Sequence, residues 1–287
     1  MRQGRSPACR PRSRVVGRAR VPYNIRMPRS ERALLAWLAG EVRRCHPLAL
    51  RHFRSSSLRV RRKPDASPVT AADRAVEERL RTALRRACPG EPIIGEEFGT
   101  TGRPTDTFWT IDPIDGTRAF SRGLPTWAIM VGRIERGVPT LGLCDFPALG
   151  VTLAVAPGVP AHEGMGSRRT ALPRPRRVPL RGAVVLHGGL RWWPSGRALQ
   201  GLIRVAHASY LERAYGDCYG YLWALRGYAD AVLDYGVKIW DMVPLAALAH
   251  ATGRVMTDFK GRPCWTGPDT VFASPAMARQ IVRLLRP

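Results

Sequence analysis

Residues 112–117 of this 287-residue chain read Asp112-Pro113-Ile114-Asp115-Gly116-Thr117. The four residues before them, 108–111, are apolar or β-branched and predict a buried strand that ends at Asp112. Proline stiffens the following turn, and glycine lets the backbone approach a ligand closely. These rules leave two interpretations open: an acidic metal site beside an anion-binding turn, or an acidic loop with ordinary turn residues.

A second strand signal also ends in acidic residues. Residues 92–95 are mostly apolar and lead directly into Glu96 and Glu97. Binding sites in α/β proteins are commonly assembled at strand ends, and carboxylates crowded there raise each other's pKa. A divalent cation relieves that repulsion, and magnesium prefers oxygen ligands. The two acidic strand ends therefore favour a magnesium site.

The remaining pattern alternates between helical and strand periods. In the first half we predict a helix at 30–54 with Ser30 as its N-cap, a helix that begins at Thr70 with a capping-box-like start, and strands at 127–134, 140–144 and 151–156. In the second half we predict strands at 183–186, 231–234 and 254–257, and helices at 196–207, 218–226, 241–251 and 275–285. This order predicts an α/β fold in which helices cover the faces of sheets.

Proline, glycine and arginine dominate residues 157–181, which we interpret as a surface loop between two lobes. The predicted organisation is a disordered basic N-terminal extension at 1–27, an N-terminal α+β lobe with the metal site at 28–170, and a C-terminal α/β lobe at 171–287. The extension holds eight arginines and no acidic residue within 1–26, and Met27 is an alternative start of the protein.

The formal net charge of +24 comes almost entirely from arginine, since the chain has three lysines. The arginines are spread along the chain, which favours a compositional bias over a nucleic-acid partner, although attraction to a polyanion stays open. The six cysteines lack CxxC spacing and predict reduced thiols in a cytoplasmic protein. No apolar run approaches the ~20 residues of a membrane span.

Four segments of the chain resemble the inositol monophosphatase family. Gly95-Glu96-Glu97, the 112–117 stretch and Trp240-Asp241 resemble its three signature blocks in the same order, and residues 67–73 resemble its segment near the metals. The resemblance covers roughly residues 30–287. It implies a layered α-β-α-β-α sandwich of the sugar-phosphatase kind with two lobes, a magnesium-dependent phosphomonoesterase activity with two or three ions, and a homodimer.

The same resemblance implies roles for single residues. One metal would be held by Glu96, Asp112 and the carbonyl of Ile114, and a second by Asp112, Asp115 and Asp241. Asp73 and Thr117 would orient the attacking water, and the backbone N–H groups of Gly116 and Thr117 would hold the phosphate. Asp217 and Asp234 would contact the organic part of the substrate; the family often has Glu at the position of Asp234.

A narrower resemblance concerns the substrate. Residues 115–120, 123–127 and 216–219 resemble the histidinol-phosphatase branch of that family. This implies that L-histidinol phosphate is the small phosphorylated metabolite that is hydrolysed. Inositol 1-phosphate and fructose 1,6-bisphosphate are the alternative substrates, and a basic nucleic-acid-associated protein with weak catalysis is the alternative of another class.

Several of these residues also have simpler interpretations. Asp241 can be the N-cap of the helix at 241–251, Asp73 the acid of a capping box, and Asp217 the cap of the next helix. We expect Lys63 to be a solvated lysine, with a contact to a phosphate or to a carboxylate of the metal loop as the alternative, and Glu97 to be a supporting or surface acid.

Overall fold

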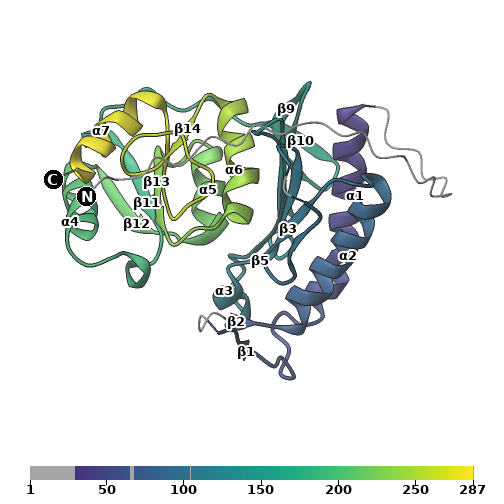
Figure 1. Ribbon diagram of the computed structural model, residues 1–287. Coiled ribbons are helices and arrows are strands. Elements are labelled where there is room, and N and C mark those ends of the chain that lie inside the picture. The colour runs from purple at the N-terminus through teal and green to yellow at the C-terminus, as the bar shows by residue number, and fades with distance from the viewer. Residues whose placement is uncertain (1–29, 65–67, 104, 287) are drawn as a thin grey trace, which may run out of the picture.

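The computed structural model describes residues 30–64, 68–103 and 105–286. The predicted basic extension and the alternative start at Met27 lie outside these residues. Within them, two sheets alternate with three layers of helices (Figure 1), so the expected α-β-α-β-α sandwich is confirmed.

The first layer holds helices α1 (Glu31–Leu50) and α2 (Ala71–Ala87), which pack against each other and against the outer face of the larger sheet. The hydroxyl of Ser30 accepts from the backbone N–H of Ala33, which confirms the predicted N-cap. Thr70 and Asp73 form the capping box at the start of α2. Apolar residues at helical spacing, such as Leu38 and Leu80, are fully buried beneath them. Before α2, the short strands β1 (Arg61–Arg62) and β2 (Pro68–Val69) pair antiparallel.

The larger sheet has eight strands in the order β10-β9-β8-β7-β6-β5-β3-β4. Only the pairing of β3 with β5 is parallel; the other neighbours are antiparallel. Its strands are β3 (Ile93–Gly95), β4 (Gly99–Thr101), β5 (Phe108–Asp115), β6 (Ala128–Glu135), β7 (Val138–Phe146), β8 (Val151–Ala156), β9 (Val159–Met165) and β10 (Arg168–Ala171). A short helix, α3 (Thr117–Ser121), follows β5 directly.

Helix α6 (Ile239–Thr252) lies between the two sheets with α5 (Asp217–Leu225) beside it. Glycines on the larger sheet let α6 come close. A Cβ atom at Gly142 would lie 2.2 Å from the carbonyl oxygen of Pro244, and one at Gly132 would lie 2.7 Å from Val243. Because these two glycines face each other across β6 and β7, they form one shallow seat for the helix. This glycine seat sets the distance between α6 and the larger sheet, including the end of β5.

The smaller sheet has five strands in the order β12-β11-β13-β15-β14. Helices α4 (Arg197–Ala208) and α7 (Pro275–Leu285) cover its outer face. Its strands are β11 (Val184–His187), β12 (Leu211–Ala214), β13 (Ala231–Tyr235), β14 (Val255–Thr257) and β15 (Asp269–Ala273). The short 3-10 helices η1 (Leu180–Gly182) and η2 (Leu190–Trp192) flank β11.

The prediction of a surface loop at 157–181 is wrong for residues 159–171 and right for residues 172–179, which form a mostly exposed connection. Residues 159–171 form β9 and β10, a hairpin that ends the larger sheet. Its arginines and prolines suit an exposed edge, which natural sheets protect with charge. Strands β4, β12 and β15 were also missed in the sequence because they are short and two of them carry few apolar residues. The change from one sheet to the other falls between Ala171 and Val184, and we retain the division into two lobes near residue 170 as a proposal.

Candidate active site

Three aspartates from two elements meet at one end of the larger sheet. Asp112 and Asp115 lie on β5 and Asp241 lies on α6, and one carboxylate oxygen of each falls within 4.8 Å of the others. Residues three apart on a regular strand face opposite sides of the sheet. The register of β5 against β6 shifts between Asp112 and Asp115, and this irregularity brings both side chains to the same side. Pro113, which lacks an N–H, sits inside the irregular segment, where proline is tolerated.

The predicted end of this strand was partly wrong, because β5 continues past Asp112 to Asp115. The expectation that Asp241 could be an N-cap is also wrong. Helix α6 begins at Ile239, and Asp241 accepts a hydrogen bond from the backbone N–H of Lys238 at 2.7 Å through one oxygen. Asp241 thus both closes the first turn of its helix and belongs to the aspartate cluster.

The aspartates are held together against their mutual repulsion. Burial, and next the charge of Glu96, raise the pKa of Asp112 well above its usual range. Burial and the charges of Asp217 and Asp241 do the same for the pKa of Asp115. Burial raises the pKa of Asp241 to about 7. An all-oxygen set of crowded carboxylates is the donor set that a hard divalent cation prefers, so the cluster fits a metal ion.

Glu96 lies near this cluster but bonds to a lysine. The Lys63 ammonium lies 2.7 Å from Glu96 and 2.5 Å from Glu97, with its side chain 17% exposed. Burial lowers the Lys63 pKa, but hydrogen bonds to the two glutamates outweigh it and raise the pKa overall. The expectation of a solvated Lys63 is therefore wrong, and Glu97 is 4% exposed, not a surface acid. The structure instead has the alternative, a contact of Lys63 with the two carboxylates that follow β3.

A buried ion pair beneath the Glu96 turn was not found from the sequence. Glu77 and Arg81 on α2 pair at 2.6 Å, and Glu77 also accepts from the backbone N–H groups of Glu97 and Phe98 at 2.7 and 3.1 Å. A Cβ atom at Gly95 would lie 2.2 Å from the Glu77 carboxylate, so glycine is required there. The only signal was the i,i+4 spacing of Glu and Arg on the apolar face of α2.

Asp73 and Thr117 come together from distant parts of the chain. The Thr117 hydroxyl lies 3.2 Å from one Asp73 oxygen and 3.0 Å from the carbonyl oxygen of Ile114. The other Asp73 oxygen accepts from the backbone N–H and the hydroxyl of Thr70. Burial raises the pKa of Asp73 to about 6. Asp73 is thus both the capping-box acid and a neighbour of the 112–117 turn, which fits both interpretations.

The backbone of the turn follows its sequence. Gly116 has φ +80, a left-handed conformation that glycine adopts without strain, and it precedes α3. The backbone N–H of Ile114 donates to Asp112 at 3.0 Å. The carbonyl of Ile114 and the N–H groups of Gly116 and Thr117 belong to residues next to or near Asp115 in the sequence. Their roles as ligands of the metal and the phosphate remain predictions.

Asp217 and Asp234 complete the acidic region from the side of the smaller sheet. Asp217 is solvent-accessible but surrounded by protein, and this partial burial raises its pKa to about 6 even though Arg118 opposes the effect. Its φ of +56 is unusual for a residue other than glycine, and such strain is typical of functional sites. Asp217 is the first residue of α5 rather than its cap, which is Gly216. Burial and the charge of Asp217 raise the pKa of Asp234 to about 8.

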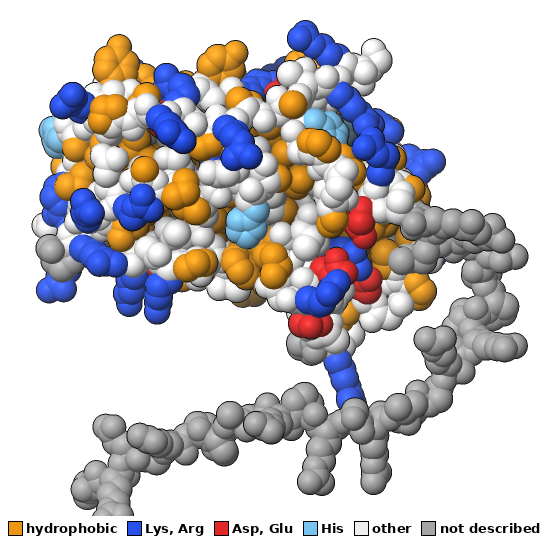
Figure 2. Space-filling view, turned by 90° about the horizontal axis from the view of Figure 1, so that it is seen from above, with side chains coloured by type: hydrophobic (Ala, Val, Ile, Leu, Met, Phe, Trp, Pro, Cys, Tyr) orange, Lys and Arg blue, Asp and Glu red, His pale blue; other side chains and the backbone are white. Residues whose placement is uncertain are grey.

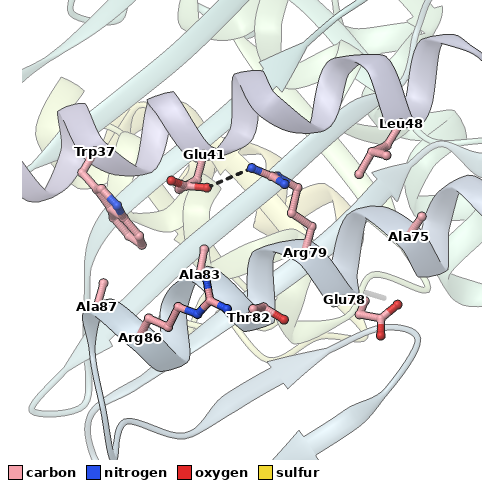
Figure 3. A pocket seen from close by; sticks show the side chains of 10 residues that line it. All are labelled: Trp37, Glu41, Leu48, Ala75, Glu78, Arg79, Thr82, Ala83, Arg86 and Ala87. Carbon is pink, nitrogen blue, oxygen red and sulfur yellow. Dashed lines mark ion pairs between the residues drawn. The ribbon is translucent and has the colours of Figure 1, made fainter. Parts of the chain in front are cut away.

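A separate groove of about 540 Å³ lies on the outer surface between α1 and α2 (Figure 3). Its walls combine apolar side chains such as Trp37 and Leu48 with polar ones, and the ion pair of Glu41 with Arg79 at 3.5 Å crosses it. The larger sheet separates it from α6 and Asp241. We therefore do not assign it to the catalytic site.

The basic side chains do not gather into one stripe on the face shown in Figure 2. Arginines and lysines are scattered there among hydrophobic and uncharged groups. A nucleic-acid binder usually concentrates them along one path. This face of the described chain therefore favours the compositional interpretation of the charge. None of the described helices is long and apolar enough to cross a membrane.

Comparison with known proteins adds to this geometry. A family model described as the inositol monophosphatase family matches residues 32–286. The histidinol-phosphatase of Mycobacterium tuberculosis is 35% identical over 210 residues, which are 73% of this chain and 81% of that protein. The histidinol-phosphatase of Streptomyces coelicolor is 32% identical over 232 residues, 79% and 86% of the two chains. The extragenic suppressor protein suhB of Bartonella henselae superposes with a TM-score of 0.78 at 21% identity, covering 88% of this chain and 98% of that one.

Proposed function

The chain belongs to the inositol monophosphatase family as a histidinol-phosphatase-like phosphatase, and we propose that it hydrolyses L-histidinol phosphate to L-histidinol and phosphate with magnesium. The observation that carries the metal requirement is the cluster of Asp112, Asp115 and Asp241, whose oxygens lie within 4.8 Å of one another. Three carboxylates at that distance repel one another when ionised, and a divalent cation with oxygen ligands relieves that repulsion.

In this proposal the chain's own groups bind and orient the substrate. Asp112, Asp115, Asp241, Glu96 and the carbonyl of Ile114 hold two or three Mg²⁺ ions. Bound Mg²⁺ lowers the pKa of water and offsets the charge of the phosphate. Glu96 would take part beside Lys63, whose ammonium lies 2.7 Å from one of its carboxylate oxygens.

The phosphate and the nucleophile are positioned by the turn after β5. The backbone N–H groups of Gly116 and Thr117 donate to the phosphate oxygens, since they open α3 with unpaired donors. Asp73 and Thr117, 3.2 Å apart, orient the attacking water and hold its proton. The Thr117 hydroxyl has one proton but lies near two acceptor oxygens, those of Asp73 and Ile114. It can donate to only one of them, so the other can accept a hydrogen bond from the attacking water. Positioning of this kind supplies much of the rate in phosphoryl transfer.

The substrate assignment depends on Asp217 and Asp234. Asp234 is buried and Asp217 is exposed beside it, and burial together with the charge of Asp217 raises the pKa of Asp234 to about 8. The ammonium group of L-histidinol phosphate would pair with them and relieve this repulsion, whereas the hydroxyls of a polyol would not. The identities of 35% and 32% to histidinol-phosphatases support the same choice.

The test is a comparison of kcat/KM for L-histidinol phosphate, inositol 1-phosphate and fructose 1,6-bisphosphate in magnesium. We expect kcat/KM to be highest for L-histidinol phosphate. We also expect Asp234→Asn to lower kcat/KM for L-histidinol phosphate more than kcat/KM for inositol 1-phosphate. Preference for either polyol phosphate would overturn the substrate assignment and leave the phosphatase assignment standing.

The proposal extends to the setting in which the enzyme works. All five cysteines in the described part of the chain are free thiols, four of them buried, which supports a reducing compartment such as the cytoplasm. We also propose a homodimer, as the family resemblance implies. Light scattering at micromolar concentration should give twice the chain mass of 31.8 kDa, and a monomer mass would contradict this part.

A further inference from the structure

We infer that Trp192 forms a binding subsite for a planar ring in the leaving group and thereby sets which phosphate monoesters the enzyme prefers. The inference rests on the proposed phosphatase function. Trp192 ends η2, and 45% of its surface is exposed. The next residue, Trp193, is 5% exposed and stacks on Phe259 with ring centroids 5.2 Å apart. Of the two consecutive tryptophans, Trp193 belongs to the core and Trp192 is partly exposed at the surface.

Three glycines lie between Trp192 and the two aspartates that we assign to the substrate, Asp217 and Asp234. A Cβ atom at Gly188 would lie 2.0 Å from a carboxylate oxygen of Asp234, and one at Gly189 would lie 3.6 Å from the Trp192 ring. A Cβ atom at Gly216, which precedes Asp217, would lie 3.5 Å from the Gly188 backbone. Trp192 and the two aspartates therefore lie around the same glycine-containing backbone, which places the indole beside the carboxylates that we assign to the organic part of the substrate.

A second contact connects Trp192 to the turn that we assign to the phosphate. The Arg118 guanidinium lies over the Trp192 ring, 4.7 Å from its centroid. Arg118 is the second residue of α3 and directly follows Thr117. If the N–H groups of Gly116 and Thr117 hold the phosphate of a monoester, the Arg118 side chain alone spans the distance from that turn to the Trp192 ring. A leaving group that extends toward the smaller sheet reaches the indole.

The chemistry of the indole selects the ligand class. Indole attracts planar rings by stacking and planar cations by a cation–π interaction. The contact of Arg118 with the Trp192 ring is an example of such a cation–π interaction. An imidazole ring, neutral or protonated, fits both modes. Stacking on an aromatic side chain contributes about 1–3 kcal/mol, or roughly 5- to 150-fold in binding.

The test separates the ring of the substrate from its ammonium group. Three monoesters are compared: L-histidinol phosphate with ring and ammonium, L-alaninol phosphate with ammonium alone, and 3-phenylpropyl phosphate with ring alone. We expect Trp192→Ala to lower kcat/KM about tenfold or more for the two ring-bearing substrates, mainly through KM, and to leave L-alaninol phosphate unchanged. Trp192→Phe should retain most of the ring preference. Leu190→Ala, an exposed neighbour in the same short helix, is the matched control and should change none of the three.

Two results would overturn the inference: an equal loss with L-alaninol phosphate, which would make Trp192 a general structural residue, or no loss with any substrate. Failure of the proposed substrate is distinguishable. If the wild type cleaves 3-phenylpropyl phosphate but not L-histidinol phosphate, the substrate assignment fails and the phenyl compound still decides the role of Trp192. If it cleaves none of the three, the proposed function fails, and calorimetric binding of 3-phenylpropyl phosphate decides: weaker binding to Trp192→Ala supports the subsite, and equal binding refutes it.

Discussion

Replacing Asp241 with Asn should stabilise the protein in the presence of a chelator while it removes activity. The reason is the crowding of the three aspartates. Two unit charges 4.8 Å apart repel by about 3.5 kcal/mol at an effective dielectric constant of 20, and Asp241 faces two such neighbours. The pKa gives a second measure. A carboxyl raised to about 7 from an unfolded value near 3.9 opposes folding by about 4 kcal/mol once it is ionised.

The amide oxygen that Asp241→Asn introduces can still accept the hydrogen bond from the Lys238 N–H, so the helix start need not be lost. We therefore expect a gain of roughly 2–4 kcal/mol at pH 8, which is roughly 3–7 °C in Tm for a chain of this size. The measurement is thermal unfolding in EDTA and in 10 mM magnesium chloride. Magnesium should raise the Tm of the wild type and have little effect on Asp241→Asn.

The control is Asp145→Asn. Asp145 is buried but has partners, with His46 at 2.6 Å and the Thr152 hydroxyl at 2.6 Å. Its replacement should destabilise the protein equally with and without magnesium, because it breaks satisfied bonds. The reasoning would be refuted if Asp241→Asn in EDTA lost as much stability as Asp145→Asn, or if magnesium stabilised it as much as the wild type.

Three further changes test other parts of the site. Gly142→Ala should cost about 1–3 kcal/mol in unfolding free energy and weaken magnesium binding, because the added methyl group pushes α6 away, whereas Gly164→Ala, with room at 3.8 Å, should do neither. Glu77→Gln should lower stability by roughly 3–5 kcal/mol, since it leaves a buried arginine uncompensated, and magnesium titration should show weakened binding as the Glu96 turn moves. Asp234 has a folded-state pKa raised to about 8, so its contribution to stability is present at low pH and is lost as pH rises to about 8; Tm measured in EDTA from pH 5 to 8 should fall less for Asp234→Asn than for the wild type, and parallel curves would contradict this.

The sequence predicted the features that depend on local chemistry. The Ser30 cap, the capping box of Thr70 with Asp73, and the strand before Asp112 are properties of a few neighbouring residues, and the structure has them. The meeting of Asp241 with Asp112 could be predicted only through the family resemblance. The two are far apart in the chain, and what joins them is the glycine seat under α6, which no local rule reveals.

The failures at the β9–β10 hairpin and at Lys63 have a common cause, since each depended on a partner distant in the sequence. The hairpin of β9 and β10 was missed because its composition suits a loop, and β8 supplies the pairing that makes it a strand. Lys63 was expected in solvent because its partners, Glu96 and Glu97, are more than 30 residues away in the sequence and are brought close by β3. The Glu77–Arg81 pair was overlooked because the sequence does not show that both charged side chains are buried. Their burial depends on the N–H groups of Glu97 and Phe98, which donate to Glu77.

The central claim is that Asp112, Asp115 and Asp241 form the metal centre of a phosphatase. The most direct measurement is phosphate release from L-histidinol phosphate by the wild type and by Asp112→Asn, each with magnesium and with EDTA. The account predicts release by the wild type only with magnesium, and a loss of at least about a thousandfold in the variant while its circular dichroism spectrum stays native. Near-normal release by Asp112→Asn, or wild-type release that persists in EDTA, would contradict it.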